Sequence, residues 1–316
     1  MSAASQPTRT ATAAADRAAG GPEPERHAGA TVDFTLLAVA IAGVSLSAPL
    51  IAATAAPALA IAFWRNAMAV GALSPFALVR HRGELRRMGR RALLLSIAAG
   101  AVLALHFGLW LPSLSMTSVA SSTALCTTTP IWTTLFLRMR GHRPPTLVWA
   151  GTLLAVVGVV ILTGVDLSLS PRALAGDALA LGGGIAAAAY VLLGAEVRRT
   201  VSTTAYTYVC YSTTAVVLLA ACLVSGSALH GYDGTTWAKL VALTVAAQLL
   251  GHSLLNRVVR GLGPSTTSTA ILLETPGAAL IAALWLGQTP PVAAYPALGV
   301  ILVGLALVVR AGRQSA

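Results

Sequence analysis

The sequence predicts an all-α polytopic membrane protein with ten transmembrane helices, arranged as two inverted five-helix repeats. Three observations predict this fold. Apolar residues make up 56% of the 316 residues and charged residues only 10%, whereas soluble domains carry about 25% charged residues. Long segments nearly free of charge recur along the chain, and basic residues gather in alternate connections between them. Finally, one segment of the first half is repeated in the second half.

Apolar segments long enough to cross a bilayer follow one another from residue 34 onward. The connections between them are rich in Arg, Pro, Gly, Ser or Asp, and they are too short to form a catalytic domain outside the membrane. The expected spans are residues 34–53, 57–79, 92–111, 117–137, 146–165, 176–195, 203–224, 236–256, 264–286 and 292–309.

The placement of the basic residues predicts the orientation of these spans. If the N-terminus is cytoplasmic, 18 of the 21 basic residues lie in cytoplasmic segments. Arg172 and Lys239 fall on the other side, and Arg65 lies within a span. The net charge of +11 is therefore a topology signal rather than a nucleic-acid-binding surface. We expect a multi-pass protein of the plasma (inner) membrane with both termini cytoplasmic and no nucleic-acid partner.

The chain ends and the cysteines add further expectations. Residues 1–30 contain no apolar run and predict a disordered cytoplasmic tail; their Arg, Ser and Ala content also resembles a transit peptide, although three acidic residues argue against that interpretation. Residues 311–316 form the expected second cytoplasmic tail. The three cysteines lie within spans without metal-ligand spacing, so neither a metal site nor a cofactor is predicted.

The internal repeat has an offset of 146 residues. Residues 122–145 (STALCTTTPIWTTLFLRMRGHRPP) align without gaps to residues 268–291 (STAILLETPGAALIAALWLGQTPP), with eight identities. The register matches the fourth span to the ninth, so the repeats comprise residues 34–165 and 176–310. Five spans per repeat invert the second copy in the membrane, as in transporters whose substrate site lies between two repeats.

The fourth and ninth spans each contain a proline and end at a glycine, and the fifth and tenth spans are punctuated by glycines. In these features residues 34–310 resemble the EamA type of the drug/metabolite transporter superfamily. The resemblance implies transport of small metabolites, often export of amino acids coupled to protons. The chain differs at His142 and Gln288, where the family commonly has Glu, and Glu274 lies one residue further from Pro276 than in many members.

Glu274 is the candidate proton-coupling residue, because it lies near the middle of the expected span 264–286. Ionisable residues inside a membrane are costly and are commonly functional. The alternatives are a neutral Glu bonded to Ser or Thr of a neighbouring helix, or an ion pair with Arg65. Pro276, and Pro130 at the matching position, are expected to bend their helices and to free backbone carbonyls.

Arg65 and its neighbour Trp64 are candidate substrate-binding residues. Arg65 lies too deep in its span for an ordinary loop charge, and a guanidinium suits a carboxylate of the substrate or of Glu274. The alternative is that Arg65 extends toward the membrane surface. The repeat places Tyr211 at the position equivalent to Arg65, so Tyr211 is a third candidate.

Two histidines also match across the repeat. His106 lies toward the outer end of its span and His252 toward the inner end of its own. They could relay protons or bind substrate, or they could be hydrogen-bonded residues of helix interfaces. Gln248, His252 and Asn256 follow at spacings of four and predict one polar face directed into the bundle, which either contacts substrate or joins helices.

These observations predict a secondary active transporter that moves a small amino acid-like or drug-like metabolite by alternating access, with proton-coupled efflux as the expected mode. The expected partners are the substrate, protons and the lipid bilayer, and no oligomeric state is predicted. The alternatives are a scaffold or sensor with the same fold, or a membrane-embedded enzyme that modifies lipids. The sequence favours neither enzyme nor ATP-driven pump, since it lacks catalytic triads, nucleotide-binding loops and metal clusters.

Overall fold

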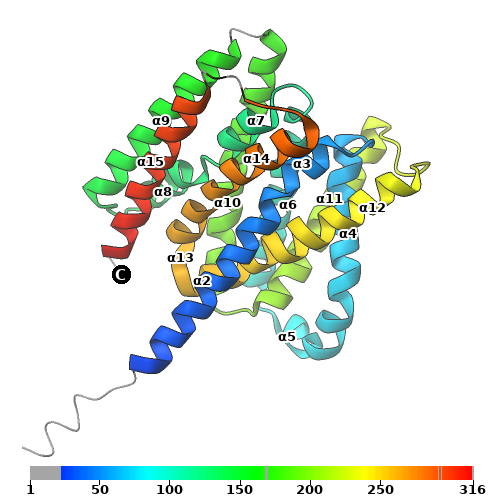
Figure 1. Cartoon of the computed structure of the whole chain (residues 1–316). Coiled ribbons are helices and arrows are strands. Elements are labelled where there is room, and N and C mark those ends of the chain that lie inside the picture. Colours follow the sequence, from blue (N-terminus) through cyan, green and yellow to red (C-terminus); the bar gives the residue numbers. More distant parts are fainter. Residues whose placement is uncertain (1–22, 168–169, 291, 293, 315–316) are drawn as a thin grey trace, which may run out of the picture.

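A computed structural model describes residues 23–167, 170–290, 292 and 294–314, and these residues form helices and connections without strands (Figure 1). The helices of the first half are α2 (Glu23–Ser45), α3 (Ser47–Ala52), α4 (Ala58–Pro75), η1 (Phe76–Arg80), α5 (Arg82–Arg87), α6 (Arg90–Ser113), α7 (Val119–Cys126), α8 (Thr129–Met139) and α9 (Thr146–Leu167). Those of the second half are α10 (Pro171–Val197), α11 (Thr203–Ser225), α12 (Gly234–Leu243), η2 (Thr244–His252), α13 (Ser253–Ala270), η3 (Ile271–Leu273), α14 (Glu274–Leu286) and α15 (Ala294–Gln314).

Helical segments lie over every expected span, and five helices within the described residues are long and apolar enough to cross a membrane. These are Val32–Ala52, Arg90–Ser113, Pro171–Val197, Thr203–Ser225 and Gly234–Gly263. The others are shorter or interrupted, so the number of ten spans remains a prediction. Large apolar side chains also cover the outside of the bundle; Leu153, Val216 and Leu284 are each at least 66% exposed. Such a surface suits lipid rather than water.

The expected tails differ from the structure at their inner ends. The predicted disordered tail, residues 1–30, overlaps α2, which begins at Glu23. Residues 1–22 of this tail lie outside the described residues. Glu23 and Pro24 are both compatible with the first turn of a helix. At the other end α15 continues to Gln314, so the described part of the predicted second tail is helical.

Several helices begin where the sequence supplies a capping side chain. Ser118, Ser170, Ser202 and Asp233 each precede a helix and accept a hydrogen bond from the backbone N–H three residues later. This bond satisfies one of the backbone donors that the first turn of a helix leaves without a partner. The short polar connections therefore set where α7, α10, α11 and α12 start.

The fourth and ninth segments are broken at equivalent places. α7 ends at Cys126 and α8 begins at Thr129, while η3 ends at Leu273 and α14 begins at Glu274. With the offset of 146, Thr129 corresponds to the second residue of α14. A glycine with positive φ also follows each of α8 and α14, with 87° at Gly141 and 66° at Gly287. This backbone conformation favours glycine, which explains why the repeat preserves it.

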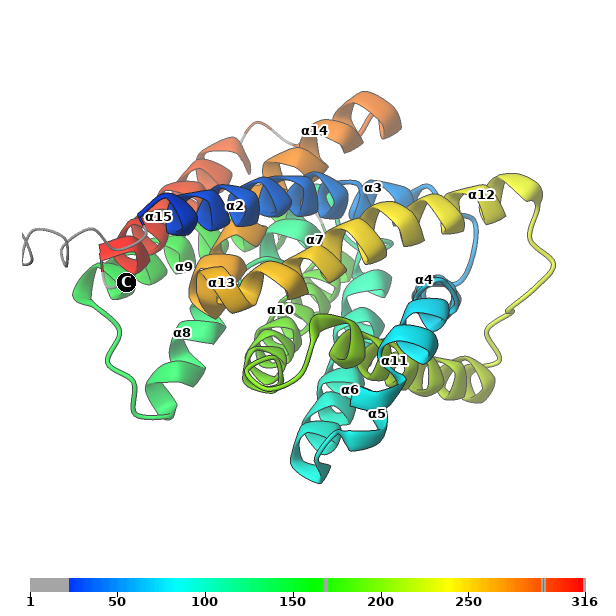
Figure 2. The same ribbon diagram turned by 90° about the horizontal axis from the view of Figure 1, so that it is seen from below.

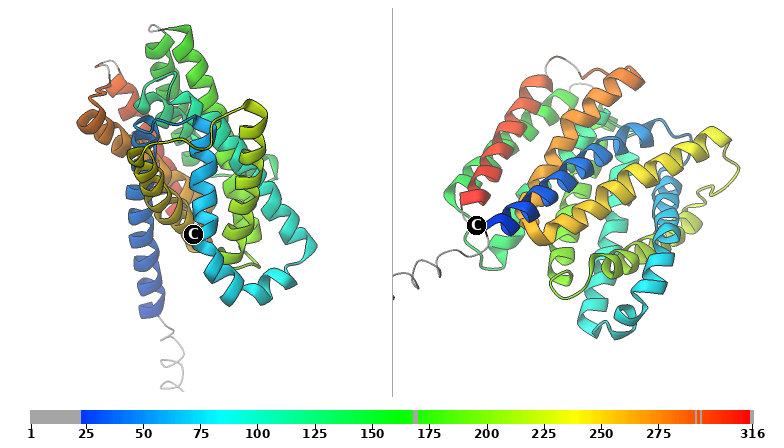
Figure 3. Two further views of the ribbon diagram at one scale, coloured as in Figure 1. Left: turned by 90° about the vertical axis from the view of Figure 1, so that its right-hand side faces the viewer. Right: turned by 60° about the horizontal axis from the view of Figure 1, so that its bottom comes forward.

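The main helix contacts join one repeat to the other. α2 packs against η2 and α13, α4 against α11, α6 against α10, and α7 against α14. Figures 2 and 3 show α2 running alongside η2 and α13 from further directions. α6 and α10 are the third and sixth segments, and their counterparts in the other repeat are the eighth and the first. Those counterparts, η2 with α13 and α2, also pack against each other, as expected of an inverted repeat.

The last helices of the two repeats, α9 and α15, form a close pair at one side of the bundle, away from α4 and α11 (Figures 1 and 2). Glycines allow the approach. A Cβ atom added to Gly304 would lie 2.6 Å from the carbonyl oxygen of Gly151, and one added to Gly158 would lie 2.7 Å from the side chain of Ile301. Gly151, Gly158 and Gly304 thus form a helix-packing surface between the fifth and tenth segments.

Candidate functional site

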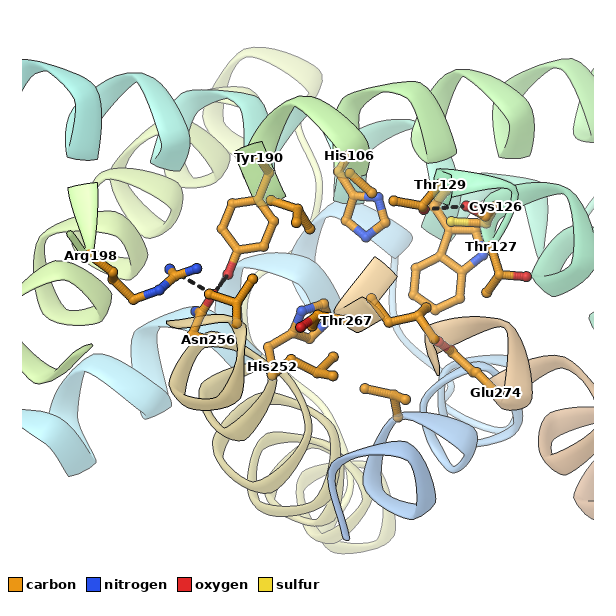
Figure 4. Close-up of a pocket in the computed structure, with 17 residues that line it drawn as sticks. His106, Cys126, Thr127, Thr129, Tyr190, Arg198, His252, Asn256, Thr267 and Glu274 are labelled. Carbon is orange, nitrogen blue, oxygen red and sulfur yellow. Dashed lines mark hydrogen bonds between the residues drawn. The ribbon is translucent and has the colours of Figure 1, made fainter. Parts of the chain in front are cut away.

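A cavity lies between the two repeats, where α6, α10 and α13 meet both broken helices (Figure 4). Its wall is mostly apolar and includes Val44, Val191 and Leu255. It leaves about 50 Å³ for the centres of water-sized molecules, which corresponds to a few waters. A metabolite could enter only if helices or side chains move.

Threonines hold the two helix breaks together beside this cavity. The hydroxyl of Thr127 lies 2.8 Å from that of Thr275, so the breaks of the fourth and ninth segments are joined directly. Thr127 and Thr128 also bond to carbonyls of the preceding turn, those of Thr123 and Leu125. Short hydroxyl side chains can satisfy carbonyls that an interrupted helix leaves free. This accounts for the run of threonines before Pro130.

The two prolines lie in the first turns of the helices that follow the breaks. Pro130 is the second residue of α8, and Pro276 is the third residue of α14. A proline costs little there, because the N–H groups of a first turn have no partner within the helix. The interruption therefore precedes each proline, instead of a bend being centred on it.

Glu274 begins α14 and lines the cavity with only 6% of its surface exposed. No ion pair within 4.0 Å joins it to Arg65 or to another of the described residues. The position of Glu274 at the start of α14 thus places a buried carboxyl group at the junction of the two repeats.

His106 and His252 are brought together in the cavity wall. Their ring centroids are 6.4 Å apart and the rings are inclined by 65°. The Nδ1 atom of His106 donates to the carbonyl of Gly183 over 3.0 Å, since a carbonyl can only accept, and this leaves the Nε2 atom as the acceptor in the neutral ring. The two histidines come from different long helices, α6 and the segment Gly234–Gly263, and their expected placement in the outer and inner halves of the membrane stays a prediction.

Arg65 is completely buried in a polar cluster behind the cavity wall. Its Nε atom donates to Oε1 of Gln248 over 2.9 Å, its Nη1 atom donates to Ser47 over 3.3 Å, and its guanidinium lies 4.4 Å from the ring centroid of Phe107. Arg65 does not extend to the membrane surface. The side-chain N–H of Gln248 donates to Asn66 over 3.0 Å. Neither Arg65 nor Gln248 is among the cavity-lining residues.

The other predicted substrate-binding residues divide between the cavity and its surroundings. Tyr211 donates to the backbone carbonyl of Gln248 over 3.4 Å, and Trp64 packs against Trp237 and donates to the carbonyl of Leu229. Neither lines the cavity, whereas His252 does.

The polar residues of the eighth segment face two different places, the Arg65 cluster and the cavity. η2 is a π-helix, in which the N–H of Ser253 bonds to the carbonyl of Gln248 five residues earlier. Gln248 therefore binds the Arg65 cluster, while His252 and Asn256 line the cavity.

Arg198 lines the cavity, although its place between two expected spans predicted a cytoplasmic charge. It directly follows α10, yet its residue surface is only 2% exposed and its side chain lines the cavity. Its Nη1 atom donates to Oδ1 of Asn256 over 3.2 Å, and its guanidinium lies 4.7 Å from the ring centroid of Tyr206. Nothing in the charge pattern distinguishes it from the exposed Arg199 beside it.

Comparisons with known proteins agree on fold and family. The sequence model of a family described as "EamA-like transporter family" matches residues 31–164 and 174–310, once for each repeat. Among 27 matching chains of solved structures, one titled "Crystal structure of protein" is 19% identical, with a TM-score of 0.63 over 90% of this chain and 99% of its own. At this identity the likeness concerns the fold alone. No curated protein matches the sequence.

Proposed function

Because the chain belongs to the EamA-like transporter family, we propose that it is a secondary active transporter that exports a small amino acid-like or drug-like metabolite in exchange for protons. The proposed location is the plasma membrane, with both termini in the cytoplasm. The observation that carries this proposal is the contact between Thr127 and Thr275, beside the buried Glu274. The two repeats meet there through helix breaks, next to an acid and a cavity.

This arrangement supports alternating access. The cavity is too small for a metabolite in the present conformation, so loading from either side requires the repeats to separate. Broken helices can move as two halves, and the joined breaks are a natural place for this separation. In the proposed cycle, protonation of Glu274 and binding of substrate are alternative ways to stabilise the same junction.

Coupling can be tested in proteoliposomes loaded with a mixture of the twenty standard amino acids. An imposed pH gradient should increase their release by the wild type above that of protein-free liposomes. Glu274→Gln keeps the shape of the side chain but cannot ionise, so its release should no longer respond to the gradient. Glu196→Gln makes the same chemical change at a side chain that is 35% exposed, and this control should respond as the wild type does.

Two results would contradict the proposal in different ways. If Glu274→Gln responded to the pH gradient like the wild type, Glu274 would not be the coupling residue, although transport itself would stand. If the wild type released none of the amino acids, export of amino acid-like metabolites would be excluded.

A further inference from the structure

A buried cation, Arg198, lines the cavity. Arg198 makes no ion pair within 4.0 Å with the described residues. The neighbouring acid, Glu196, instead pairs with the exposed Arg91 and Arg199. A buried charge without a counter-charge is costly, and proteins retain such groups where a ligand supplies the missing charge.

Two hydrogen-bond donors at this end of the cavity also lack partners. The Nε atom of Arg198 and the Nδ2 atom of Asn256 are both buried without a hydrogen bond, and both residues line the cavity (Figure 4). The orientation of the Asn256 amide is fixed, because its Oδ1 atom accepts from Tyr190 over 2.8 Å and from Arg198 over 3.2 Å. The amide nitrogen therefore remains available as a donor.

The fold makes room for this arrangement. A Cβ atom added to Gly194 would lie 2.6 Å from both Nη1 of Arg198 and the hydroxyl of Tyr206. Glycine at this position lets the guanidinium turn back against α10 and lie over the Tyr206 ring. The Arg198 side chain is thus held in the bundle by packing, a ring contact and a hydrogen bond, although it starts at a helix end.

We propose that Arg198 and Asn256 bind the carboxylate of the transported metabolite. A carboxylate offers two oxygens for the two free donors and one negative charge for the guanidinium. A phosphate dianion would leave a charge unbalanced in a cavity that also contains Glu274. The apolar remainder of the wall, including Val191 and Leu255, suits an apolar body. The substrate class is therefore a small monocarboxylate with an apolar side chain, and this inference rests on the proposed transport function.

The test compares acids with matched amides. Proteoliposomes are loaded with the twenty standard amino acids and their carboxamides, and the release of each compound is measured by mass spectrometry and corrected for protein-free liposomes. The wild type should release apolar amino acids faster than their amides. Arg198→Gln should lower the release of the acids by about tenfold or more, the effect of losing a charged hydrogen bond, and should leave the amides unchanged.

Two further variants separate binding from folding. Asn256→Asp supplies a carboxylate directly beside Arg198, so it should fold and yet abolish the preference for acids by occupying the guanidinium. Arg199→Gln removes the same charge from the adjacent residue, whose side chain is 77% exposed, and it should behave as the wild type.

The outcomes distinguish this inference from the proposed function. Release of amides as fast as acids by the wild type, or a preference for acids that persists in both Arg198→Gln and Asn256→Asp, would overturn the carboxylate site and leave transport in place. Failure of the wild type to release any compound would overturn the proposed transport and the carboxylate site with it.

Discussion

Arg65 and Tyr211, which occupy equivalent positions in the two repeats, bind the same residue, Gln248. Arg65 donates to its side-chain oxygen over 2.9 Å and Tyr211 donates to its backbone carbonyl over 3.4 Å. Gln248 is completely buried, and its carbonyl also accepts the backbone N–H of Ser253 at the end of the π-helix η2. One glutamine of the eighth segment therefore links the second and seventh segments.

Removal of the Gln248 side-chain amide should destabilise the protein. Gln248→Leu removes the partners of the buried Arg65 Nε atom and of the Asn66 Oδ1 atom, so we expect the free energy of unfolding to fall by about 2–3 kcal/mol. Gln288→Leu makes the same change at an exposed position and should alter it by less than about 0.5 kcal/mol. Denaturant titration in detergent micelles measures both, and equal effects would contradict this role of Gln248.

Small residues between α9 and α15 should be required at some positions and dispensable at others. In Gly304→Ala the new Cβ atom would lie 2.6 Å from backbone atoms of Gly151 and Ala155, so the helices must separate at a cost of about 1–3 kcal/mol. Gly299, in the same helix, has no atom within 4 Å of an added Cβ. Gly299→Ala should therefore stabilise by up to about 1 kcal/mol through helix propensity. Thermal unfolding distinguishes the two, and a stabilised Gly304→Ala would refute the close contact.

Glu84 should make stability depend on pH. Burial tends to raise the pKa of this carboxyl group, but hydrogen bonds from the side chain and backbone of Ser202 and the contact with His81 outweigh burial, so its pKa is lowered. A lowered pKa in the folded state stabilises the protein above the unfolded value, near 4.5, and this stabilisation is lost as the pH falls through the folded value.

The measurement for Glu84 is the unfolding midpoint between neutral pH and about pH 3.5. Glu84→Gln should have a lower midpoint than the wild type at neutral pH, because the ionised acceptor for Ser202 is gone, and this difference should shrink in acid. A difference that stays constant over the whole range would show that ionisation of Glu84 does not contribute.

The contact between the helix breaks should be a point where transport can be arrested. In a chain with its three cysteines replaced by alanine, Thr127→Cys with Thr275→Cys places two thiols where hydroxyls lie 2.8 Å apart. Oxidation should form a disulfide and stop release from proteoliposomes, and reduction should restore it. Each single variant should be insensitive to the oxidant. Unchanged flux through the cross-linked protein would show that the repeats do not separate here.

Much of this fold could be predicted from repeated local signals. The scarcity of charge predicted a multi-pass membrane protein, and the family resemblance is confirmed. The repeated prolines and glycines predicted special backbone at equivalent places, and both helix breaks and the positive φ angles of Gly141 and Gly287 occur there. Such features could be predicted because each depends on backbone geometry within a few residues.

The cavity was harder to predict because it depends on side-chain direction. Arg198 and Arg199 are adjacent and both suit a membrane surface, yet only Arg198 turns into the bundle, where Gly194 and Tyr206 accommodate it. His106 and His252 come from the third and eighth segments, and their ring centroids lie 6.4 Å apart. Both placements depend on contacts between helices that are far apart in the sequence, and no local sequence pattern predicts such contacts.

The close pairing of α9 with α15 has a consequence for biosynthesis. α9 completes the first repeat, but its partner α15 begins only at Ala294 and so leaves the ribosome much later. Until then the surface around Gly151 and Gly158, which later contacts Gly304 and Ile301, faces lipid or other helices. A nascent chain that stops before residue 294 therefore lacks this contact altogether, and that side of the bundle can close only after α15 has been made.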